Sequence, residues 1–291
     1  MAWVALGAAV AAGAFLVARE QATGGEAVDP PARGLPETPD YHALYVDAAD
    51  PRRLLLGTHV GVYESADGGV SWRFAGLEGK DAMHFGRERD GTLWVAGHEV
   101  LERSEDGGAT WEEMRPDGLP GRDIHGFAVS HDVDGLMYAA VAGEGLYRSD
   151  DGGASFRPIS TNVGPEVNAL ALTSEGVLFA ADGERGVFAN ANGDGVEWVR
   201  ALAMPALGLA SNRAADPPRM RVLAAGRSVQ LFTYPREWKE VLQLEGRWAG
   251  PVAFAPGDPS VAYAVSFDPD EPGSGLLYRS RDGGATWRRV R

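Results

Sequence analysis

Short apolar runs alternate with polar turns along most of this chain. Residues 42–47 and 53–57 are largely apolar, and residues 61–65 alternate between apolar and polar side chains before a Gly-rich turn. Runs of three to six residues, bounded by Gly, Asp and Pro, are typical of β-strands joined by tight turns. Helical periodicity is absent after residue 40. The pattern therefore predicts an all-β fold.

One phrase recurs four times: Ser-x-Asp-Gly-Gly-x-Ser/Thr followed by an aromatic residue, beginning at Ser65, Ser104, Ser149 and Ser280. Asp and Ser side chains can accept hydrogen bonds from the backbone just downstream, and Gly adopts the positive φ that tight turns require. The phrase predicts a hairpin turn, which we call an aspartate turn, with an aromatic anchor after it. We expect a structural role for its residues Asp67, Trp72, Asp106, Trp111, Asp151, Phe156, Asp282 and Trp287.

The spacing of the aspartate turns defines a repeat. The first three begin 39 and 45 residues apart, and the gap of 131 residues before the fourth is close to three periods. Two degenerate copies are expected in that gap, at residues 190–198 and 233–238. Periods of about 40–50 residues are those of β-propeller blades. We therefore predict a six-bladed β-propeller over residues 41–291, with four-stranded blades and each aspartate turn between the third and fourth strands.

Details of this propeller also follow from the pattern. The fourth, fifth and sixth units are expected to begin at Val167, Leu207 and Pro251. No strand is expected to be exchanged between the first and last blades, so ring closure would depend on side-chain packing. A β-sandwich is the rival interpretation, but it gives no reason for the repeat.

The first forty residues differ from the rest. Residues 2–18 are apolar without a break, which predicts a signal peptide or a helical membrane anchor within residues 1–19. An uncleaved anchor is favoured because no Ala-x-Ala cleavage site is well placed after the run. Residues 20–40 are rich in Gly, Pro, Ala and Glu and are interpreted as a flexible linker. We therefore expect the propeller outside the cytoplasm, either membrane-anchored or secreted.

Composition narrows the choice of partners. The formal net charge is −14, with 41 acidic residues against 27 Lys and Arg. A nucleic-acid partner is not expected, because nucleic-acid binding relies on Lys and Arg that neutralise phosphates. The absence of cysteine excludes disulfides, a Cys-based metal site and a lipoprotein anchor. Membrane contact is expected through the N-terminal segment only, and the propeller is expected to be a monomer.

The aspartate turns resemble the Asp-box, or BNR repeat, of sialidase-like β-propellers, over roughly residues 41–291. Residues 54–72 look most like small exported bacterial proteins that carry labels such as BNR-type glycosyl hydrolase or YVTN/WD40-like repeat protein. Propellers with this repeat include sialidases, sortilin-type receptors, xyloglucanases and a photosystem II assembly factor. The resemblance implies the fold and a place in the bacterial cell envelope, whereas function has to be argued from a site.

Sialidase activity is not expected from this sequence. The resemblance would imply an Arg-Ile-Pro segment, three arginines that bind a carboxylate and a Tyr/Glu nucleophile pair, but the chain has no Arg-Ile-Pro. Its arginines are predicted beside the aspartate turns or on outer strands, away from a central site: Arg73, Arg103, Arg148, Arg157, Arg279, Arg288 and Arg289. Motifs of nucleophilic hydrolases, phosphate loops and zinc proteases are also missing.

Histidines mark the face opposite the aspartate turns, where the first strand of each blade begins and the second meets the third. All six histidines precede residue 132. Three are assigned to equivalent positions at the start of a first strand, and two to equivalent loops between second and third strands: His42, His84 and His125, and His59 and His98. Only His131 is predicted on the other face. Acidic residues lie just before the first strands, at Asp81, Asp123 and Glu166.

Three interpretations of the five histidines remain open. They can be a device of the repeat that bonds neighbouring blades. They can bind a divalent metal, because neutral imidazoles with carboxylates suit Zn²⁺, Ni²⁺ or Cu²⁺. They can also bind another polar ligand from a protein or a glycan. Placement in only three blades favours a ligand, since a structural device should recur in all six. No cofactor other than such a metal is expected.

The sequence thus favours a non-catalytic binding or assembly module that uses its His-rich face. The alternative from another class is a glycoside hydrolase on the same face. Glycoside hydrolysis needs two carboxylates about 5–10 Å apart, and the candidates are Asp81, Asp123 and Glu166. An enzyme is the less favoured interpretation, because nothing in the sequence indicates that any of these carboxylates is desolvated.

Overall fold

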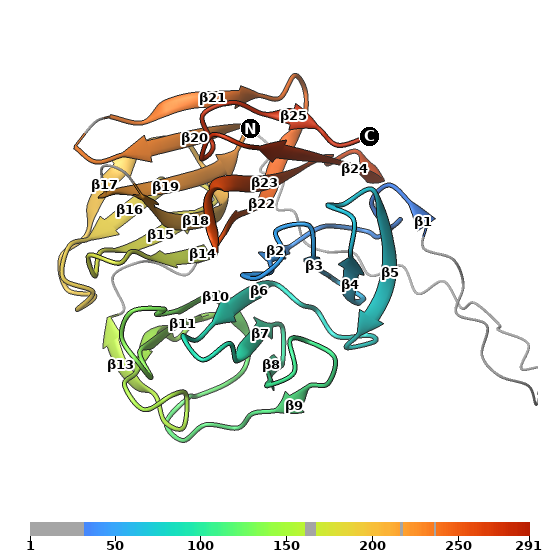
Figure 1. Cartoon of the computed structure of the whole chain (residues 1–291). Helices are drawn as coiled ribbons and strands as arrows, with labels where there is room; N and C mark the ends of the chain where they lie inside the picture. Colours follow the sequence, from blue (N-terminus) through green and yellow to red (C-terminus); the bar gives the residue numbers. More distant parts are fainter. Residues whose placement is uncertain (1–31, 161–166, 216–217, 236) are drawn as a thin grey trace, which may run out of the picture. The chain divides into compact units, whose positions relative to one another are not determined.

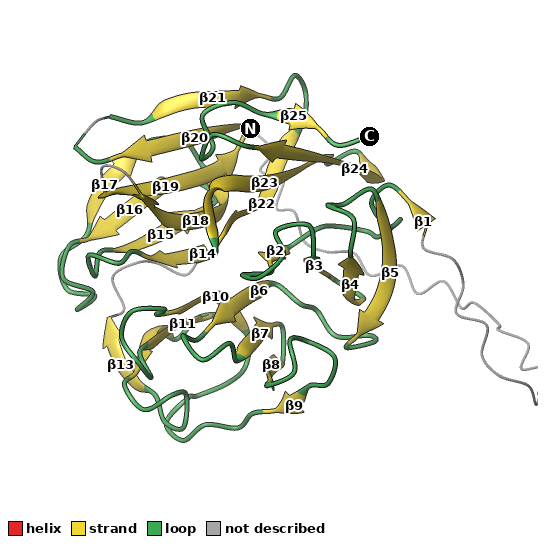
Figure 2. Ribbon diagram, in the orientation of Figure 1, coloured by secondary structure: helices red, strands yellow, loops and turns green. Residues whose placement is uncertain are grey.

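The computed structural model describes residues 32–160, 167–215, 218–235 and 237–291 (Figure 1). The chain divides into two compact units, residues 1–30 and 31–291, and every described residue belongs to the second. The described residues form strands and loops without a helix (Figure 2). The predicted signal peptide or anchor, residues 1–19, and residues 20–31 of the predicted linker lie outside the described residues.

Six antiparallel sheets follow one another along the described chain, each with four consecutive strands in meander order. Blade 1 contains β2 (Ala43–Val46), β3 (Leu54–Thr58), β4 (Gly61–Ser65) and β5 (Ser71–Gly76), with β1 (Ala32–Arg33) at its outer edge. Blade 2 contains β6 (His84–Arg87), β7 (Leu93–Gly97), β8 (Val100–Ser104) and β9 (Glu112–Glu113). Blade 3 contains β10 (Ile124–Val129), β11 (Met137–Val141), β12 (Gly145–Ser149) and β13 (Arg157–Ser160).

The last three blades have the same order. Blade 4 contains β14 (Val167–Leu172), β15 (Leu178–Asp182), β16 (Gly186–Asn190) and β17 (Val199–Leu202). Blade 5 contains β18 (Ala206–Ala215), β19 (Pro218–Gly226), β20 (Ser228–Thr233) and β21 (Lys239–Gln243). Blade 6 contains β22 (Trp248–Ala255), β23 (Asp258–Asp268), β24 (Glu271–Ser280) and β25 (Arg288–Arg289). These starts lie within three residues of the predicted ones.

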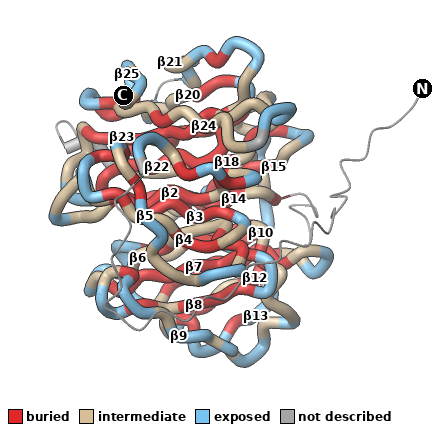
Figure 3. Tube along the Cα trace, turned by 90° about the vertical axis from the view of Figure 1, so that its right-hand side faces the viewer, coloured by how far each residue is buried: buried red, intermediate tan, exposed pale blue. Residues whose placement is uncertain are grey.

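The first strands of the six blades are neighbours around a ring: β2, β6, β10, β14, β18 and β22. Residues from all six line one narrow central channel. Figure 1 shows the chain passing around this ring, and Figure 3 shows that the inner strands are mostly buried while the outermost strands and the loops are more exposed. The predicted all-β, six-bladed β-propeller with four-stranded blades is confirmed.

The aspartate turns join the third and fourth strands of blades 1, 2, 3 and 6. In the first, Asp67 Oδ1 accepts hydrogen bonds from the backbone N–H groups of Val70 and Ser71 at 2.9 and 3.0 Å, and Oδ2 accepts the Ser71 hydroxyl at 2.6 Å. The Ser65 hydroxyl donates to Asp67 Oδ1 and accepts from Gly69 N–H, both at 2.8 Å. Very similar contacts recur at Asp106, Asp151 and Asp282. Each carboxylate therefore bonds donors of its own turn.

The degenerate copies occupy the same place in blades 4 and 5. Between β16 and β17, Asn190 Nδ2 donates to Asp194 Oδ1 at 2.9 Å, and Trp198 Nε1 donates to the Gly195 carbonyl at 3.0 Å. This copy therefore keeps an equivalent of the turn. The copy between β20 and β21 has no aspartate, but Trp238 packs there against Phe232 at a ring separation of 5.4 Å.

Aromatic residues after the turns pack between adjacent blades. Trp72 is 2 % exposed and lies with Tyr263 and Leu277 of blade 6, while its Nε1 donates to the Gly69 carbonyl at 3.1 Å. Phe156 is buried against blade 2, and Trp111 and Trp287 are partly buried against blades 1 and 5. The ring thus closes by side-chain packing between blades 6 and 1.

Residues 32–40, which composition places in the flexible linker, pack on blade 1. β1 pairs with β5 in an antiparallel register that sets Ala32 opposite Trp72. The Tyr41 hydroxyl donates to the Pro36 carbonyl at 2.9 Å, and Thr38 is buried. The described residues 32–40 thus form the outer edge of blade 1 and contact its core. A strand of two residues is too short to give a periodic signal, so the sequence did not predict it.

Candidate functional site: a His–Asp face on blades 1 to 3

His84 does not share the position of His42 and His125, contrary to the sequence-based assignment. Regular pairing with the second strand runs from the residue after His42 and after His125, but from His84 itself. The residue before it, Met83, therefore holds the equivalent place in blade 2. Because successive side chains point to opposite faces of a strand, a slip of one residue gives the His84 side chain a different direction from those of His42 and His125.

Acidic residues keep the register that His84 breaks. Asp40, Asp81 and Asp123 each lie two residues before this shared position, in blades 1, 2 and 3. Glu166 has the same spacing in blade 4 but lies outside the described residues. Asp40 was not predicted as a site residue, because its segment reads as a linker. The shared Asp-x-His spacing at residues 40–42 and 123–125 is the signal that identifies it.

Backbone packing fixes Asp81 between blades 1 and 2. The N–H of Ala82 donates to the Thr58 carbonyl, and the N–H of Met83 donates to the Ala96 carbonyl, both at 3.0 Å. A Cβ on Gly97 would lie 1.9 Å from the Asp81 carbonyl oxygen, so this close approach of two backbones requires glycine. Asp81 is held there at 7 % exposure.

The Asp81 carboxylate faces three histidines. Its Oδ1 lies 3.3 Å from His42 Nε2, and its Oδ2 lies 3.0 Å from His59 Nδ1 and 3.2 Å from His98 Nδ1. These are ion-pair distances, yet among the described residues neither oxygen accepts a hydrogen bond of acceptable geometry. The three imidazoles and the carboxylate therefore lie close together without hydrogen bonds between them. A buried carboxylate in this state is costly unless it is paired or binds a metal.

Two groups of three residues flank Asp81, and each offers one possible ligand atom per residue with all three atoms within 4.8 Å of one another. The blade 1 trio consists of Asp40, His42 and His59. In it, Asp40 Oδ2 lies 3.1 Å from His42 Nε2 and 4.0 Å from His59 Nδ1. Asp40 also accepts the backbone N–H of His59 at 3.1 Å, which ties the strand entry to the loop.

The second group, the blade 2–3 trio, consists of His98, Asp123 and His125. His98 Nε2 lies 3.0 Å from His125 Nε2 and 3.7 Å from Asp123 Oδ1, and His125 Nε2 lies 3.2 Å from Asp123 Oδ1. His125 sits at a β-bulge, an irregularity that re-aims a side chain. We call the two trios together with Asp81 the His–Asp face.

The surroundings shift the pKa values of His42, Asp40 and His84 in different ways. Burial opposes the charge of His42, but the contacts with Asp40 and Asp81 outweigh it and raise the pKa of this imidazole. Burial likewise opposes the charge of Asp40, but His42 and the His59 backbone lower the pKa of this carboxyl overall. Desolvation lowers the pKa of His84 to about 3, against a hydrogen bond between its Nε2 and the His125 carbonyl oxygen at 2.9 Å. His84 is therefore neutral near pH 7.

The central channel beside this face is small. Its cavity of about 60 Å³ is lined by His42 and His84 together with apolar residues of all six first strands. This volume holds a few water molecules, not a sugar ring. Any glycan would therefore have to bind over the exposed mouth rather than inside the channel.

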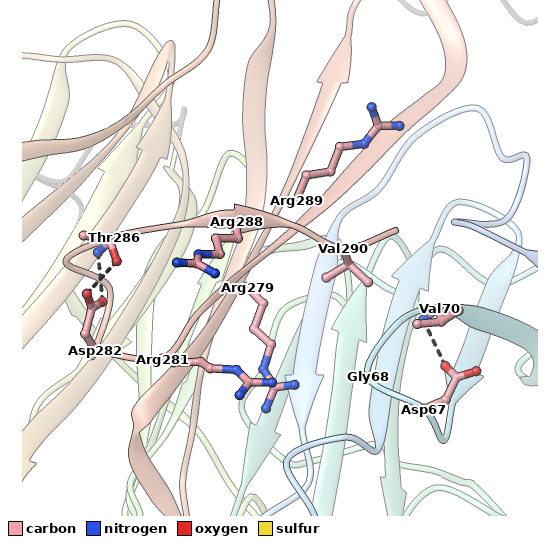
Figure 4. Close-up of a pocket in the computed structure, with 10 residues that line it drawn as sticks. All are labelled: Asp67, Gly68, Val70, Arg279, Arg281, Asp282, Thr286, Arg288, Arg289 and Val290. Atoms are coloured by element: carbon pink, nitrogen blue, oxygen red, sulfur yellow. Dashed lines mark hydrogen bonds between the residues drawn. The ribbon is translucent and has the colours of Figure 1, made fainter.

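A second cavity, of about 640 Å³, lies on the aspartate-turn side, between blade 6 and the first turn. Figure 4 shows four arginines around it from β24, β25 and the turn that joins them: Arg279, Arg281, Arg288 and Arg289. Asp67 and Asp282 also line it, but both are bonded within their own turns (Figure 4). Arg279 stacks on the Tyr263 ring at 5.5 Å. This wall is cationic in a protein of net charge −14.

Among the described residues there is no helix with the length and apolar character needed to cross a membrane.

Comparison with known proteins gives similarity at the level of fold. No family model matches the chain, and no curated protein matches its sequence. A structure of YCF48 bound to a D1 peptide has a TM-score of 0.55 at 18 % identity, covering 88 % of this chain and 83 % of that one. The U3-55K structure has a TM-score of 0.58 at 14 % identity, covering 92 % and 85 %.

A third similar structure is the GH74 xyloglucanase from Xanthomonas campestris. It has a TM-score of 0.58 at 19 % identity, over 89 % of this chain and 46 % of that enzyme. This chain thus spans about half the length of the enzyme. At such identities the likeness shows a shared propeller fold, in peptide-bound and catalytic proteins alike.

Proposed function

We propose that this protein is a non-catalytic binding or assembly module outside the cytoplasm, tethered by its N-terminal segment, whose His–Asp face binds a divalent transition metal. One observation carries the proposal: Asp81, 7 % exposed, faces three imidazoles while its oxygens accept no hydrogen bond among the described residues. Imidazole and carboxylate ligands suit Zn²⁺, Ni²⁺ or Cu²⁺. A bound cation would offset the negative charge of the buried Asp81 carboxylate.

A purely structural role is the competing explanation for the histidines. His84 fits that role, because it is desolvated and bonds the backbone of the neighbouring blade. The other four predicted histidines belong to the His–Asp face, and their side chains are 25–55 % exposed: His42, His59, His98 and His125. Asn168 stands at the equivalent place in blade 4, so the device does not recur around the ring. Partial exposure and restriction to three blades support a ligand.

A protein or peptide is the favoured binding partner of such a module. YCF48, which has a similar fold, is bound to a peptide in its structure. The turn hydrogen bonds described above also support our proposal that the aspartate turns are Asp-boxes. No feature of the net charge favours nucleic acid.

The test is titration calorimetry of the full chain with Zn²⁺ after removal of metal by a chelator. We expect saturable binding at micromolar concentration or tighter, and loss of at least tenfold in affinity for Asp81→Asn. His131→Asn is the matched control, because His131 lies in the β10–β11 loop and, among the acidic residues that the structure describes, pairs only with Asp132. An absence of heat for the unaltered chain would refute metal binding.

Glycoside hydrolysis remains the second candidate, because GH74 enzymes are among the similar structures and two carboxylates lie on the His–Asp face, the buried Asp81 and the partly exposed Asp123. A panel of nitrophenyl glycosides and polysaccharides, including xyloglucan, tests it. We expect no turnover. Turnover by the unaltered chain that is lost in Asp123→Asn would show that the protein is an enzyme and would refute the non-catalytic function.

A further inference from the structure

The metal proposed above can be assigned to a particular arrangement of ligands. We propose that the His–Asp face holds two divalent transition-metal ions, one in the blade 1 trio and one in the blade 2–3 trio, joined through Asp81. This inference rests on the proposed function but goes beyond it, since a single ion would already satisfy that function.

The ligand atoms of the blade 2–3 trio are spaced as they would be around one ion. Ligand atoms bound to one ion at about 2.0–2.2 Å are roughly 3–3.6 Å apart when the angles at the ion are near those of tetrahedral or octahedral sites. The three separations among His98 Nε2, Asp123 Oδ1 and His125 Nε2 are 3.0, 3.2 and 3.7 Å. Two imidazoles and one carboxylate are thus already placed as three ligands of one ion.

Asp81 lies on the side of the His98 ring that faces away from the blade 2–3 trio. His98 turns Nε2 toward its trio, while its other ring nitrogen, Nδ1, lies 3.2 Å from Asp81 Oδ2. Metal-binding histidines typically donate the remaining ring N–H to a carboxylate, which fixes the tautomer and the orientation of the ring. In this structure the two groups lie at ion-pair distance without a hydrogen bond. We expect Asp81 to act as a positioning residue by orienting the His98 ring when the blade 2–3 ion binds.

Asp81 also lies next to the blade 1 trio. Its Oδ1 lies 3.3 Å from His42 Nε2 and its Oδ2 lies 3.0 Å from His59 Nδ1, within the range of two ligands on one ion. Asp40 Oδ2 lies 3.1 Å from His42 Nε2, so this imidazole nitrogen is within ion-pair distance of both Asp40 and Asp81. One carboxylate thus serves as a ligand on one side and orients a ligand on the other.

Several of the proposed ligand side chains are accessible to solvent. The side chains of His98, Asp123 and His125 are 47 %, 48 % and 30 % exposed, and that of His59 is 55 % exposed. An ion with three protein ligands keeps open positions for water or for a group of a bound partner. Both ions would therefore face the partner, while Asp81 lies buried beneath them.

The decisive measurement is stoichiometry. In titration calorimetry of the chelator-treated full chain with Zn²⁺, we expect two ions per chain. His125→Asn and His42→Asn should each reduce this to one, because each removes a ligand from a different trio. Asp81→Asn should weaken both sites, by 10–100-fold for the blade 2–3 ion, the usual effect of losing a carboxylate behind a histidine ligand. His131→Asn should retain two ions.

Each outcome decides a separate question. Zero ions would refute both this inference and the proposed function, whereas one ion in the unaltered chain would refute only the pair. Two ions with unaltered affinities in Asp81→Asn would overturn the shared carboxylate. Electron paramagnetic resonance of the Cu²⁺-loaded chain gives an independent check. Two ions linked through Asp81 should give a spectrum broadened by their coupling, and His125→Asn should restore a single isolated signal.

Discussion

Two sets of aspartates recur along this propeller, and their surroundings differ. The turn aspartates accept hydrogen bonds from hydroxyl and backbone N–H groups within a few residues, so their charge is stabilised locally. Asp81 on the opposite face meets imidazoles from three other segments and accepts no hydrogen bond among the described residues. A carboxylate bonded within its own turn thus belongs to the scaffold, while a buried one that accepts no hydrogen bond and faces several imidazoles indicates a binding site.

The largest expected effect tests whether the aspartate turns and their anchors are the scaffold. Trp72→Ala should lower the free energy of unfolding by about 3–5 kcal/mol, because the side chain is 2 % exposed where blade 6 meets blade 1. Urea unfolding followed by fluorescence or circular dichroism measures it. Trp111→Ala, at a partly buried indole, should cost less. Equal effects would show that closure of the ring adds nothing at Trp72.

The next effect tests whether the opposite face is a site. Zn²⁺ at a hundredfold excess over its dissociation constant should raise the free energy of unfolding by about 2.7 kcal/mol for one ion, through preferential binding to the folded chain. Thermal unfolding with and without chelator measures this as a shift in Tm. His131→Asn should keep the shift and Asp81→Asn should lose most of it. The same shift in both variants would place the metal elsewhere.

A smaller effect compares the two kinds of aspartate directly, in protein kept free of metal. Asp67→Ala should cost about 1–2 kcal/mol, because it leaves the N–H groups of Val70 and Ser71 without their acceptor. Asp81→Asn should cost nothing or stabilise the fold, since it removes a buried charge without hydrogen bonds. Urea unfolding of both variants gives the contrast. A loss at Asp81 as large as that at Asp67 would make Asp81 a scaffold residue.

The smallest effect is in the acid range. Hydrogen bonds from Thr110 and Ser155, together with their backbone N–H groups, lower the pKa of Asp106 and Asp151 to about 2, from a usual value near 3.8. Between these values the unfolded chain binds protons that the folded chain does not, so stability should fall as pH falls from about 4 to 2. In the double variant Asp106→Asn and Asp151→Asn this decline should be shallower. An identical pH profile would contradict the role given to these carboxylates.

Much of the fold was predictable because its signals are local. The aspartate turn is a set of hydrogen bonds within seven residues, so its recurrence defined the number of blades and the order of strands before any contact between blades was known. The degenerate copy at residues 190–198 kept enough of this chemistry to be found. β1 was missed, because a two-residue strand leaves no pattern.

The candidate site was only partly predictable. His42, His59, His98 and His125 come together as expected, because equivalent positions in successive blades share a face of the ring. His84 departs from them by a slip of one residue, which changes the direction of a side chain on a strand but hardly alters the sequence pattern. Asp40 joined the site from a segment whose composition resembles a linker. Three arginines predicted beside the turns or on outer strands line a cavity that the sequence did not predict: Arg279, Arg288 and Arg289.

The sequence by itself determined the repeat, the turns and the face on which histidines gather, since each depends on residues close together in the chain. The tertiary structure decided which of those residues meet. Only the packing of blade 2 against blade 1, with Gly97 allowing the Asp81 backbone to approach, buries that carboxylate among imidazoles from three segments. Burial and partner geometry are properties of contacts between distant residues, so composition and spacing could indicate that an acid was present but not that it was buried among imidazoles without accepting a hydrogen bond.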